Sequence, residues 1–195
     1  MQTMNKRNLI VGGLSMAALA VLNSGCTTTS GAAGDPAAQR EALNAQTDNA
    51  LARLYREARD SEALVQQSRG VLVFPSFVSA GFIVGGASGR GVLREGGKTV
   101  SYHRMTEGSV GLLAGAQSQA VFILFMTDDS LSRFKSSNGW TVGADAGVTM
   151  LTVGADARVT GRTAQQPVVG FVLTNSGLMG SLSLNGSRIT PLNFN

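Results

Sequence analysis

The sequence has 195 residues, of which 43% are hydrophobic and 14% charged, and it contains one cysteine and one histidine. The formal net charge is +4, but Lys6 and Arg7 supply two of these charges at the extreme N-terminus, so the rest of the chain carries only +2. This small excess gives little electrostatic support for nucleic-acid binding. A single cysteine and a single histidine also exclude a zinc site built from these residue types.

The N-terminal segment has the pattern of an export signal. Lys6 and Arg7 precede an apolar stretch from Leu9 to Leu22 that is interrupted only by small residues. About 14 residues are too few to cross a bilayer core, which requires about 20. We therefore interpret residues 1–25 as a signal peptide and leave them out of the fold prediction.

Cys26 follows this stretch directly, and a lone cysteine in an exported chain is a free thiol, an intermolecular bridge or a lipid attachment point. The segment resembles a bacterial lipobox, in which small residues precede the cysteine that becomes acylated. Ser24 and Gly25 fit this pattern and Asn23 departs from it. Lipidation at Cys26, with palmitate among the acyl groups, is the interpretation we favour, and signal cleavage nearby with an incidental cysteine is the alternative. Two or three acyl chains would anchor the protein stably.

The mature chain is expected to consist of a tether and one domain. Thr27, rather than Asp, follows the cysteine, which by resemblance to enterobacterial sorting favours the outer membrane. Residues 26–38 are rich in Thr, Ser, Gly and Ala and predict a flexible tether. Residues 39–195 have a length typical of one domain.

The domain is predicted to begin with an amphipathic helix between Gln39 and Ala58, in which apolar residues recur at three- and four-residue spacing. Its polar side carries two pairs four residues apart, Arg53 with Glu57 and Arg56 with Asp60. Such a side is either a solvated face with internal ion pairs or a basic face that contacts a membrane. Ser61 is expected to cap a second, shorter helix that ends at Gln67.

Most of the remaining sequence predicts β-strands. Gly70–Pro75 and Val121–Met126 are continuous apolar runs, the first closed by proline, and we expect them to form the core. Between Ala80 and Leu93 large apolar residues alternate with glycines, which mark bulges or bends in small curled sheets. Glu95-Gly96-Gly97-Lys98 predicts a hairpin turn that leads into a strand over Thr99–Met105.

One late helix is expected over Asp128–Ser136, starting at Asp128 or Asp129. Together these elements predict an α+β, mostly β fold. In it, one or two N-terminal helices pack on a curled antiparallel sheet or half-open barrel.

Two segments of similar sequence begin at Thr141 and Thr152 and place an aspartate at Asp145 and at Asp156. If they formed a hairpin that turns at Met150 and Leu151, these carboxylates would face each other, which is unfavourable unless a cation lies between them. Neighbouring arginines or a different register are the alternatives, and we favour them.

The sequence offers little for catalysis. A serine hydrolase would have to use His103, but the chain has no Gly-x-Ser-x-Gly elbow. The glycines from Gly85 to Gly91 match neither nucleotide-binding pattern, Gly-x-x-x-x-Gly-Lys-Ser/Thr or Gly-x-Gly-x-x-Gly. We therefore expect a protein that is not an enzyme and requires no cofactor, with His103 as a half-buried strand residue.

The span from Ser68 to Leu192 resembles the SYLF, or Ysc84-like, domain family, which in bacteria often occurs as small lipoproteins. Three blocks of glycines and apolar residues carry the resemblance. In the second block, the apolar strand Val121–Met126 lies between the two matching segments. The blocks are Arg69–Pro75 with Ala80–Gly86 and Gly89–Leu93, then Gly111–Gln117 with Trp140–Asp145, and finally Asn175–Gly186.

The resemblance implies a lipid-binding module. Eukaryotic members bind phosphoinositide membranes through an amphipathic helix and basic residues, and fungal members also bind actin, which a secreted bacterial protein would not meet. Arg69 occupies the position where many members have a lysine, and the weaker headgroup candidates are Arg53, Arg56, Arg90 and Arg94. Because only two lysines follow Cys26, a dense polybasic patch is absent, and contact with anionic phospholipids is expected to be weak.

Two functions from different classes therefore remain. In the first, a lipid-anchored outer-membrane protein binds anionic phospholipids through this domain. In the second, a structural or host-facing envelope lipoprotein binds a protein partner and no lipid directly.

Overall fold

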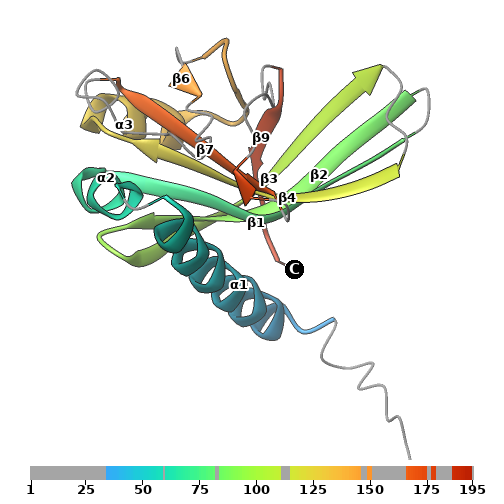
Figure 1. Ribbon diagram of the computed structural model, residues 1–195, viewed down its shortest axis with the longest axis horizontal. Helices are drawn as coiled ribbons and strands as arrows, with labels where there is room; N and C mark the ends of the chain where they lie inside the picture. Colours follow the sequence, from blue (N-terminus) through green and yellow to red (C-terminus); the bar gives the residue numbers. More distant parts are fainter. Residues whose placement is uncertain are drawn as a thin grey trace, which may run out of the picture.

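The computed structural model describes most of the domain that the sequence predicts. Within the described residues the chain forms three helices and nine strands, which make one curved sheet with helices on both faces (Figure 1). The described residues are 34–58, 60–81, 84–110, 115–145, 149–150, 166–174, 177–178 and 186–194. Cys26, the tether up to residue 33 and Asp156 lie outside them.

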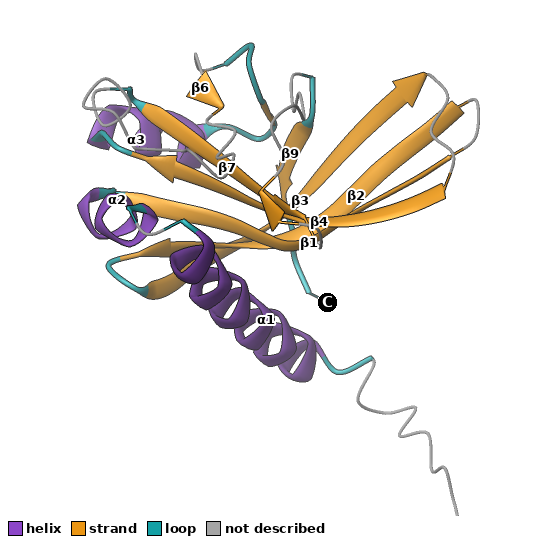
Figure 2. Cartoon of the chain, in the orientation of Figure 1, coloured by secondary structure: helices purple, strands orange, loops and turns teal. Residues whose placement is uncertain are grey.

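Four long strands form the middle of the sheet: β1 (Gly70–Gly81), β2 (Val84–Glu95), β3 (Lys98–Val110) and β4 (Gly115–Phe125). The strand order is β5-β9-β3-β2-β1-β4-β7-β6, and β8 pairs with β7. All pairings are antiparallel except that of β6 with β7. Strands outnumber helices in the described part of the domain (Figure 2). The predicted α+β, mostly β fold with a curled antiparallel sheet is thus confirmed. The shorter strands are β5 (Trp140–Thr141), β6 (Thr149–Met150), β7 (Val168–Thr174), β8 (Gly177–Leu178) and β9 (Arg188–Pro191).

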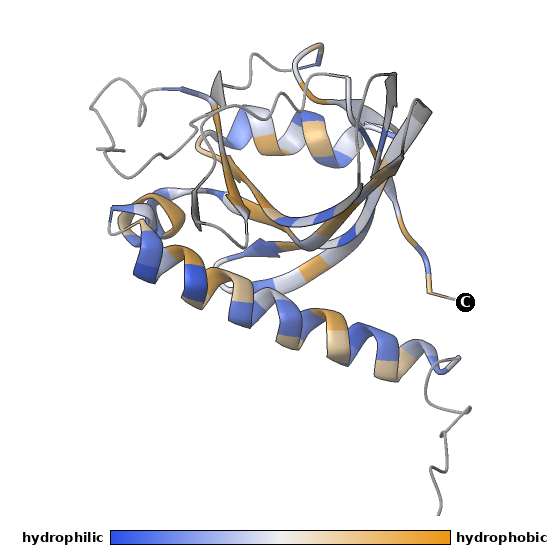
Figure 3. Cartoon of the chain, turned by 45° about the vertical axis from the view of Figure 1, so that its right-hand side comes forward, coloured by the Kyte–Doolittle hydropathy of each residue, from blue (hydrophilic) through white to orange (hydrophobic). Residues whose placement is uncertain are grey.

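Helix α1 (Pro36–Glu57) confirms the first predicted helix and begins three residues earlier than expected. The side chain of Asp35 accepts a hydrogen bond from the Ala37 amide, and Pro36 occupies the first turn, where its missing N–H costs nothing. Hydrophilic and hydrophobic residues alternate along the helix (Figure 3). Its buried side, which packs on β1 and β2, consists of Leu43, Thr47, Ala50, Leu51 and Leu54.

Helix α2 (Ser61–Gln67) has the predicted bounds, but the prediction that Ser61 caps it is wrong. Asp60 occupies the N-cap position and makes no side-chain capping bond. Ser61 is instead the first helical residue, and its hydroxyl donates to the Ala58 carbonyl at 2.6 Å. The hydroxyl therefore satisfies the end of α1 rather than the start of α2.

Pro75 does not end the first strand, contrary to the prediction. Strand β1 continues to Gly81, and its register against both neighbouring strands shifts around this residue, between Val73 and Ser76 toward β2 and between Phe74 and Phe77 toward β4. A bulge leaves a residue out of the ladder, so it accommodates a proline, which has no N–H to donate. The strand bends at Pro75 instead of stopping there.

The predicted hairpin turn is confirmed. Gly96 and Gly97 have φ values of 55° and 80°, and Glu95 pairs with Lys98. Both central residues of a two-residue type I′ turn require positive φ, which glycine adopts without steric cost. This turn joins β2 and β3 at the end of the sheet where α1 ends and α2 lies (Figure 1).

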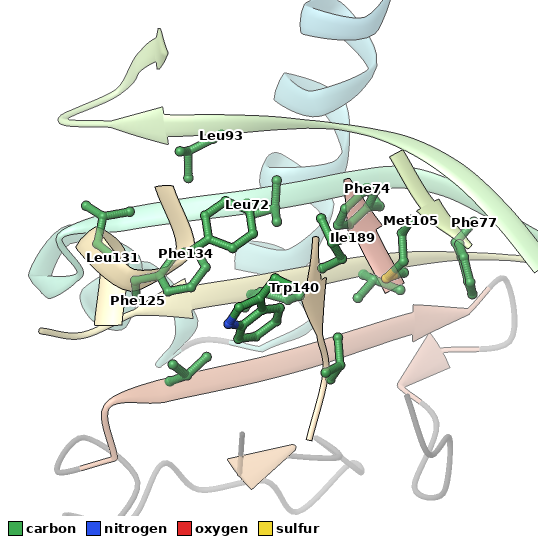
Figure 4. Packing of buried hydrophobic residues seen from close by; sticks show 14 of the residues in the cluster. Leu72, Phe74, Phe77, Leu93, Met105, Phe125, Leu131, Phe134, Trp140 and Ile189 are labelled. Atoms are coloured by element: carbon green, nitrogen blue, oxygen red, sulfur yellow. The ribbon is translucent and has the colours of Figure 1, made fainter. Parts of the chain in front are cut away.

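Each face of the sheet carries its own core. On one face, helix α3 (Asp128–Ser136) covers an aromatic cluster in which the rings of Phe125, Phe134 and Trp140 lie 4.8 to 6.0 Å apart (Figure 4). This helix begins at Asp128 as predicted, with Thr127 as its cap. On the other face, α1 and α2 cover a more aliphatic cluster formed chiefly by β1, β4 and β7. The two predicted core runs pair directly as β1 and β4.

Candidate functional site

Among the recesses that border α1 in the described structure, two differ sharply in the polarity of their walls. One has a volume of about 360 Å³ and is predominantly polar. The other, about 540 Å³, lies near the C-terminal end of α1 and has many apolar residues in its wall. We call them the polar recess and the apolar pocket. The polar recess is lined by Leu43, Gln46, Ser76, Ser88, Gly89, Arg90 and Arg104.

The polar recess contains two arginines on adjacent strands. Arg90 of β2 and Arg104 of β3 are direct partners in the antiparallel register, so their side chains lie on the same face. Like charges in this position repel each other, which destabilises the strand pair unless an anion lies between them. The serine hydroxyls of Ser76 and Ser88 line the same recess and are also suited to an anionic ligand.

A third arginine joins this pair through the C-terminal segment. The guanidinium carbons of Arg40 and Arg90 lie 5.8 and 5.9 Å from the centre of the Phe194 ring, and Tyr102 contacts the same ring edge-on at 5.1 Å. Arg40 also donates to the Phe194 carbonyl. We define Arg40, Arg90 and Arg104 as the arginine cluster. None of the ion pairs between described residues includes a member of it.

The other predicted headgroup residues are distributed over the domain. Arg53 forms an ion pair with Glu57 at 2.8 Å and donates to the Thr174 carbonyl of β7, so it fastens α1 to the sheet. Arg56 is exposed on the same helix, but α1 ends at Glu57, before the predicted partner Asp60. The structure therefore confirms only the first of the two predicted ion pairs.

Arg69 and Arg94 are each paired with an aspartate. Arg69, between α2 and β1, lies 3.4 Å from Asp128, and both side chains are largely exposed. Arg94 is only 12% exposed; it contacts Asp48 of α1 and donates to the Asn44 carbonyl. Of the five arginines predicted from the sequence, only Arg90 belongs to the arginine cluster.

Sequence reasoning missed Arg40, Arg104 and Phe194. Arg40 and Phe194 are 154 residues apart, so no local pattern connects them. Arg104 could not be found by counting the register from the predicted hairpin turn either, because a shift between Leu93 and Arg94 moves the pairing of β2 with β3 by one residue.

His103 lies on the opposite face, among the aromatic core. Burial lowers the pKa of its imidazole to about 4, and its ring contacts Phe134 at 4.8 Å. Its Nε2 shares a hydrogen bond with the Ser101 hydroxyl at 2.8 Å, whereas Nδ1 has no hydrogen-bond partner within the described structure. A hydrolytic triad needs a carboxylate on one nitrogen to orient the ring. The geometry of His103 therefore gives no support to hydrolysis.

The described residues do not complete the predicted cation site. Asp145 is exposed, and its carboxylate accepts a hydrogen bond from the Thr141 amide within the same turn. Its predicted counterpart, Asp156, lies outside the described residues. Elsewhere in the described part of the chain, no group of three or more His, Cys, Asp or Glu side chains is arranged to hold a metal ion.

Among the described helices, none combines the length and hydropathy needed to span a bilayer.

Comparison with protein families gives a match to residues 106–193, which run from β3 to the segment after β9. The matching model is Ysc84, described as a Las17-binding protein actin regulator. The chain carries a Ysc84-like domain. The match begins later than Ser68, where the resemblance to the family starts, so α1, α2, β1 and β2 precede the matched residues. No curated protein matches the sequence.

Proposed function

We propose that this protein is a lipid-anchored, non-enzymatic component of the bacterial outer membrane whose Ysc84-like domain binds anionic phospholipid headgroups. The arginine cluster carries the proposal. The guanidinium groups of Arg40 and Arg90 lie 5.8 and 5.9 Å from the centre of the Phe194 ring, and Arg104 is the cross-strand partner of Arg90. None of the three forms an ion pair among the described residues. A phosphate group between Arg90 and Arg104 would replace repulsion with charge-assisted hydrogen bonds.

The predicted N-terminal organisation supports the same function. A signal peptide up to residue 25, an acylated Cys26 and a tether that ends where α1 begins at Pro36 would hold the domain close to a membrane surface. Contact with an anionic bilayer adds about 1 kcal/mol for each basic residue near the surface. A tethered domain needs only such modest affinity, because the anchor keeps it at high local concentration.

The anchor is tested by intact-mass analysis of the protein extracted from membranes. We expect a mass increment equal to two or three acyl chains, absent from a Cys26→Ser variant. An unmodified Cys26 would contradict the anchor and leave headgroup binding to be judged by itself.

Headgroup binding is tested by cosedimentation of the full chain carrying Cys26→Ser with phosphatidylcholine vesicles, with and without phosphatidylglycerol. Replacing Arg90 and Arg104 with glutamine should weaken binding by ~2 kcal/mol, or about 30-fold. The control replaces Arg56 and Arg133, exposed on α1 and α3, with the same residue. Equal losses in the two double variants would show that net charge alone drives binding.

A second candidate function is protein binding, because the description of the matched family names a protein partner. Crosslinking in intact cells tests it. A specific partner captured by a protein that does not sediment with anionic vesicles would favour this function over the first.

A further inference from the structure

The apolar pocket lies at the opposite end of α1 from the arginine cluster. One stripe of α1, at spacings of three and four residues, supplies Asp48, Leu51, Ala52 and Tyr55. The start of β1 and the hairpin between β2 and β3 form much of the remaining wall. The full lining also includes Val65, Gln66, Ser68, Gly70, Val71, Arg94, Gly96 and Gly97.

The glycines help to explain why this space stays open. The turn demands glycine at Gly96 and Gly97, and a Cβ atom at either position would meet no atom within 4 Å. Leu51 and Val71 are almost fully buried by other contacts, while Val65 and Tyr55 are only partly buried. The pocket therefore presents apolar side chains that the fold itself does not cover. Its volume of about 540 Å³ lies within the range of about 300–1,000 Å³ typical of small-ligand sites.

Arg94 gives the pocket one strongly polar position. Its side chain is 12% exposed, so its charge is largely removed from water, yet its Nε has no hydrogen-bond partner among the described residues. Its carboxylate partner Asp48 is 64% exposed and hence screened by solvent. An anionic group in the pocket can compete with the exposed Asp48 for the guanidinium.

Tyr55 is suited to the same ligand. A tyrosine phenol is neutral at pH 7 at its ordinary pKa of 10.0, and burial, assisted by Glu62 and opposed by Arg94, raises the pKa of Tyr55 further. A neutral hydroxyl donates to an anion, whereas a phenolate would repel it.

We propose that the apolar pocket binds the acyl chain of a single-chain anionic amphiphile, a long-chain fatty acid or a lysophospholipid, with its acid group at Arg94. The apolar wall fits one chain, and the single buried guanidinium fits one anionic head. This site is separate from the arginine cluster and does not depend on headgroup binding there.

Calorimetric titration of the full chain carrying Cys26→Ser tests the proposal, because this variant cannot carry an acyl chain of its own at that residue. The ligands are decanoate, dodecanoate and tetradecanoate below their micelle concentrations. We expect saturable binding of one ligand per chain, with affinity rising about fourfold for each methylene until the pocket is filled. Binding without saturation, or without dependence on chain length, would overturn the proposal.

Ala52→Trp tests the location of the site. Ala52 lines the pocket but is exposed, so an indole can fill the space without disturbing the core. Dodecanoate binding should be abolished, while Ala63→Trp, at an exposed position of α2 outside the pocket, should bind normally. Unchanged binding by a folded Ala52→Trp variant would exclude the pocket as the site.

The two partners of the Arg94 ion pair provide the sharpest test. Arg94→Gln should weaken dodecanoate binding about tenfold and leave binding of uncharged dodecanol unchanged. Asp48→Asn should strengthen dodecanoate binding, because it removes the competing carboxylate. If both substitutions weaken binding equally, Arg94 serves only the structure, and the proposed position of the head is wrong.

Two comparisons complete the experiment. Dodecanoate and a lysophosphatidic acid with the same chain distinguish the two sources of the ligand, and tighter binding of either identifies the preferred head. The Arg90 and Arg104 double variant should bind dodecanoate normally, whereas Ala52→Trp should sediment normally with anionic vesicles. Failure at one site is thereby distinguished from failure at the other.

Discussion

The two faces of the sheet bury different kinds of side chain. The face under α3 buries aromatic rings, including Phe125, Phe134 and Trp140, in a closely packed cluster. The face under α1 buries mainly aliphatic residues and carries arginines at Arg90 and Arg94 near two open recesses. Helices α1 and α2 cover this face incompletely, so the two recesses beside α1 remain open. The comparison suggests that the α3 face provides stability and the α1 face provides binding.

Phe125→Ala tests the structural side of this division most severely. Phe125 is fully buried and contacts both Phe134 and Trp140, so its loss leaves a large cavity. We expect the free energy of unfolding to fall by ~3–5 kcal/mol, measured by urea denaturation. Val78→Ala, at a side chain that is 44% exposed, serves as the control and should change it by no more than ~0.5 kcal/mol. Similar effects of both substitutions would contradict the role given to the aromatic cluster.

His103 makes the stability of the same face dependent on pH. Its pKa is lowered by burial from 6.5 to about 4 in the folded chain, so between these values the unfolded chain binds more protons. Stability should therefore be fully present above pH 6.5 and fall as the pH drops toward 4, by up to ~3 kcal/mol. Urea denaturation at pH 7 and pH 5 measures the change. A His103→Phe variant isolates it from the carboxylates and should show a smaller decrease.

Gly91→Ala compares the packing tolerance of the two faces. A Cβ atom at Gly91 would lie 2.5 Å from the Phe74 ring and 2.8 Å from the Val73 carbonyl, so the core must shift. The expected loss of unfolding free energy is ~1–3 kcal/mol. The control is Gly108→Ala, where a Cβ atom meets nothing within 4 Å. On the α1 face, Ala52→Trp should retain the parent stability despite its much larger volume, and a large loss there would contradict an accessible pocket.

Local signals predicted the elements that depend on neighbouring residues. The turn at Gly96 and Gly97, the start of α3 at Asp128 and the apolar stripe of α1 each need only a few adjacent residues. Pro75 was misinterpreted because a proline commonly ends a strand, whereas the long pairings of β1 with β2 and β4 carry this strand through a bulge. Pairing on both sides outweighs the loss of one donor.

The arginine cluster depends on a feature that local signals do not reveal. An undistorted register counted from the hairpin turn would place His103 opposite Arg90. A shift at Leu93 and Arg94 moves the register by one residue, so that Arg104 faces Arg90 and His103 turns into the aromatic core. The third arginine and Phe194 join only through the tertiary fold. Three of the five predicted headgroup residues, Arg53, Arg69 and Arg94, are instead residues that the fold uses in ion pairs.

The smallest expected effect concerns a helical ion pair that occurs once on each face of the sheet. Arg53 of α1 and Arg133 of α3 each pair with a carboxylate four residues away, but only Arg53 also donates to a strand, at the Thr174 carbonyl. A helical pair of this kind contributes ~0.3–0.5 kcal/mol, and a hydrogen bond from a charged group contributes ~1.5–3 kcal/mol when it is well buried. Because the Arg53 side chain is 31% exposed, we expect Arg53→Ala to lower the free energy of unfolding by ~1 kcal/mol, and Arg133→Ala by less than ~0.5 kcal/mol. Equal effects in urea denaturation would mean that the contact with β7 does not fasten α1. The helix could then separate from the sheet at its C-terminal end, where the apolar pocket lies.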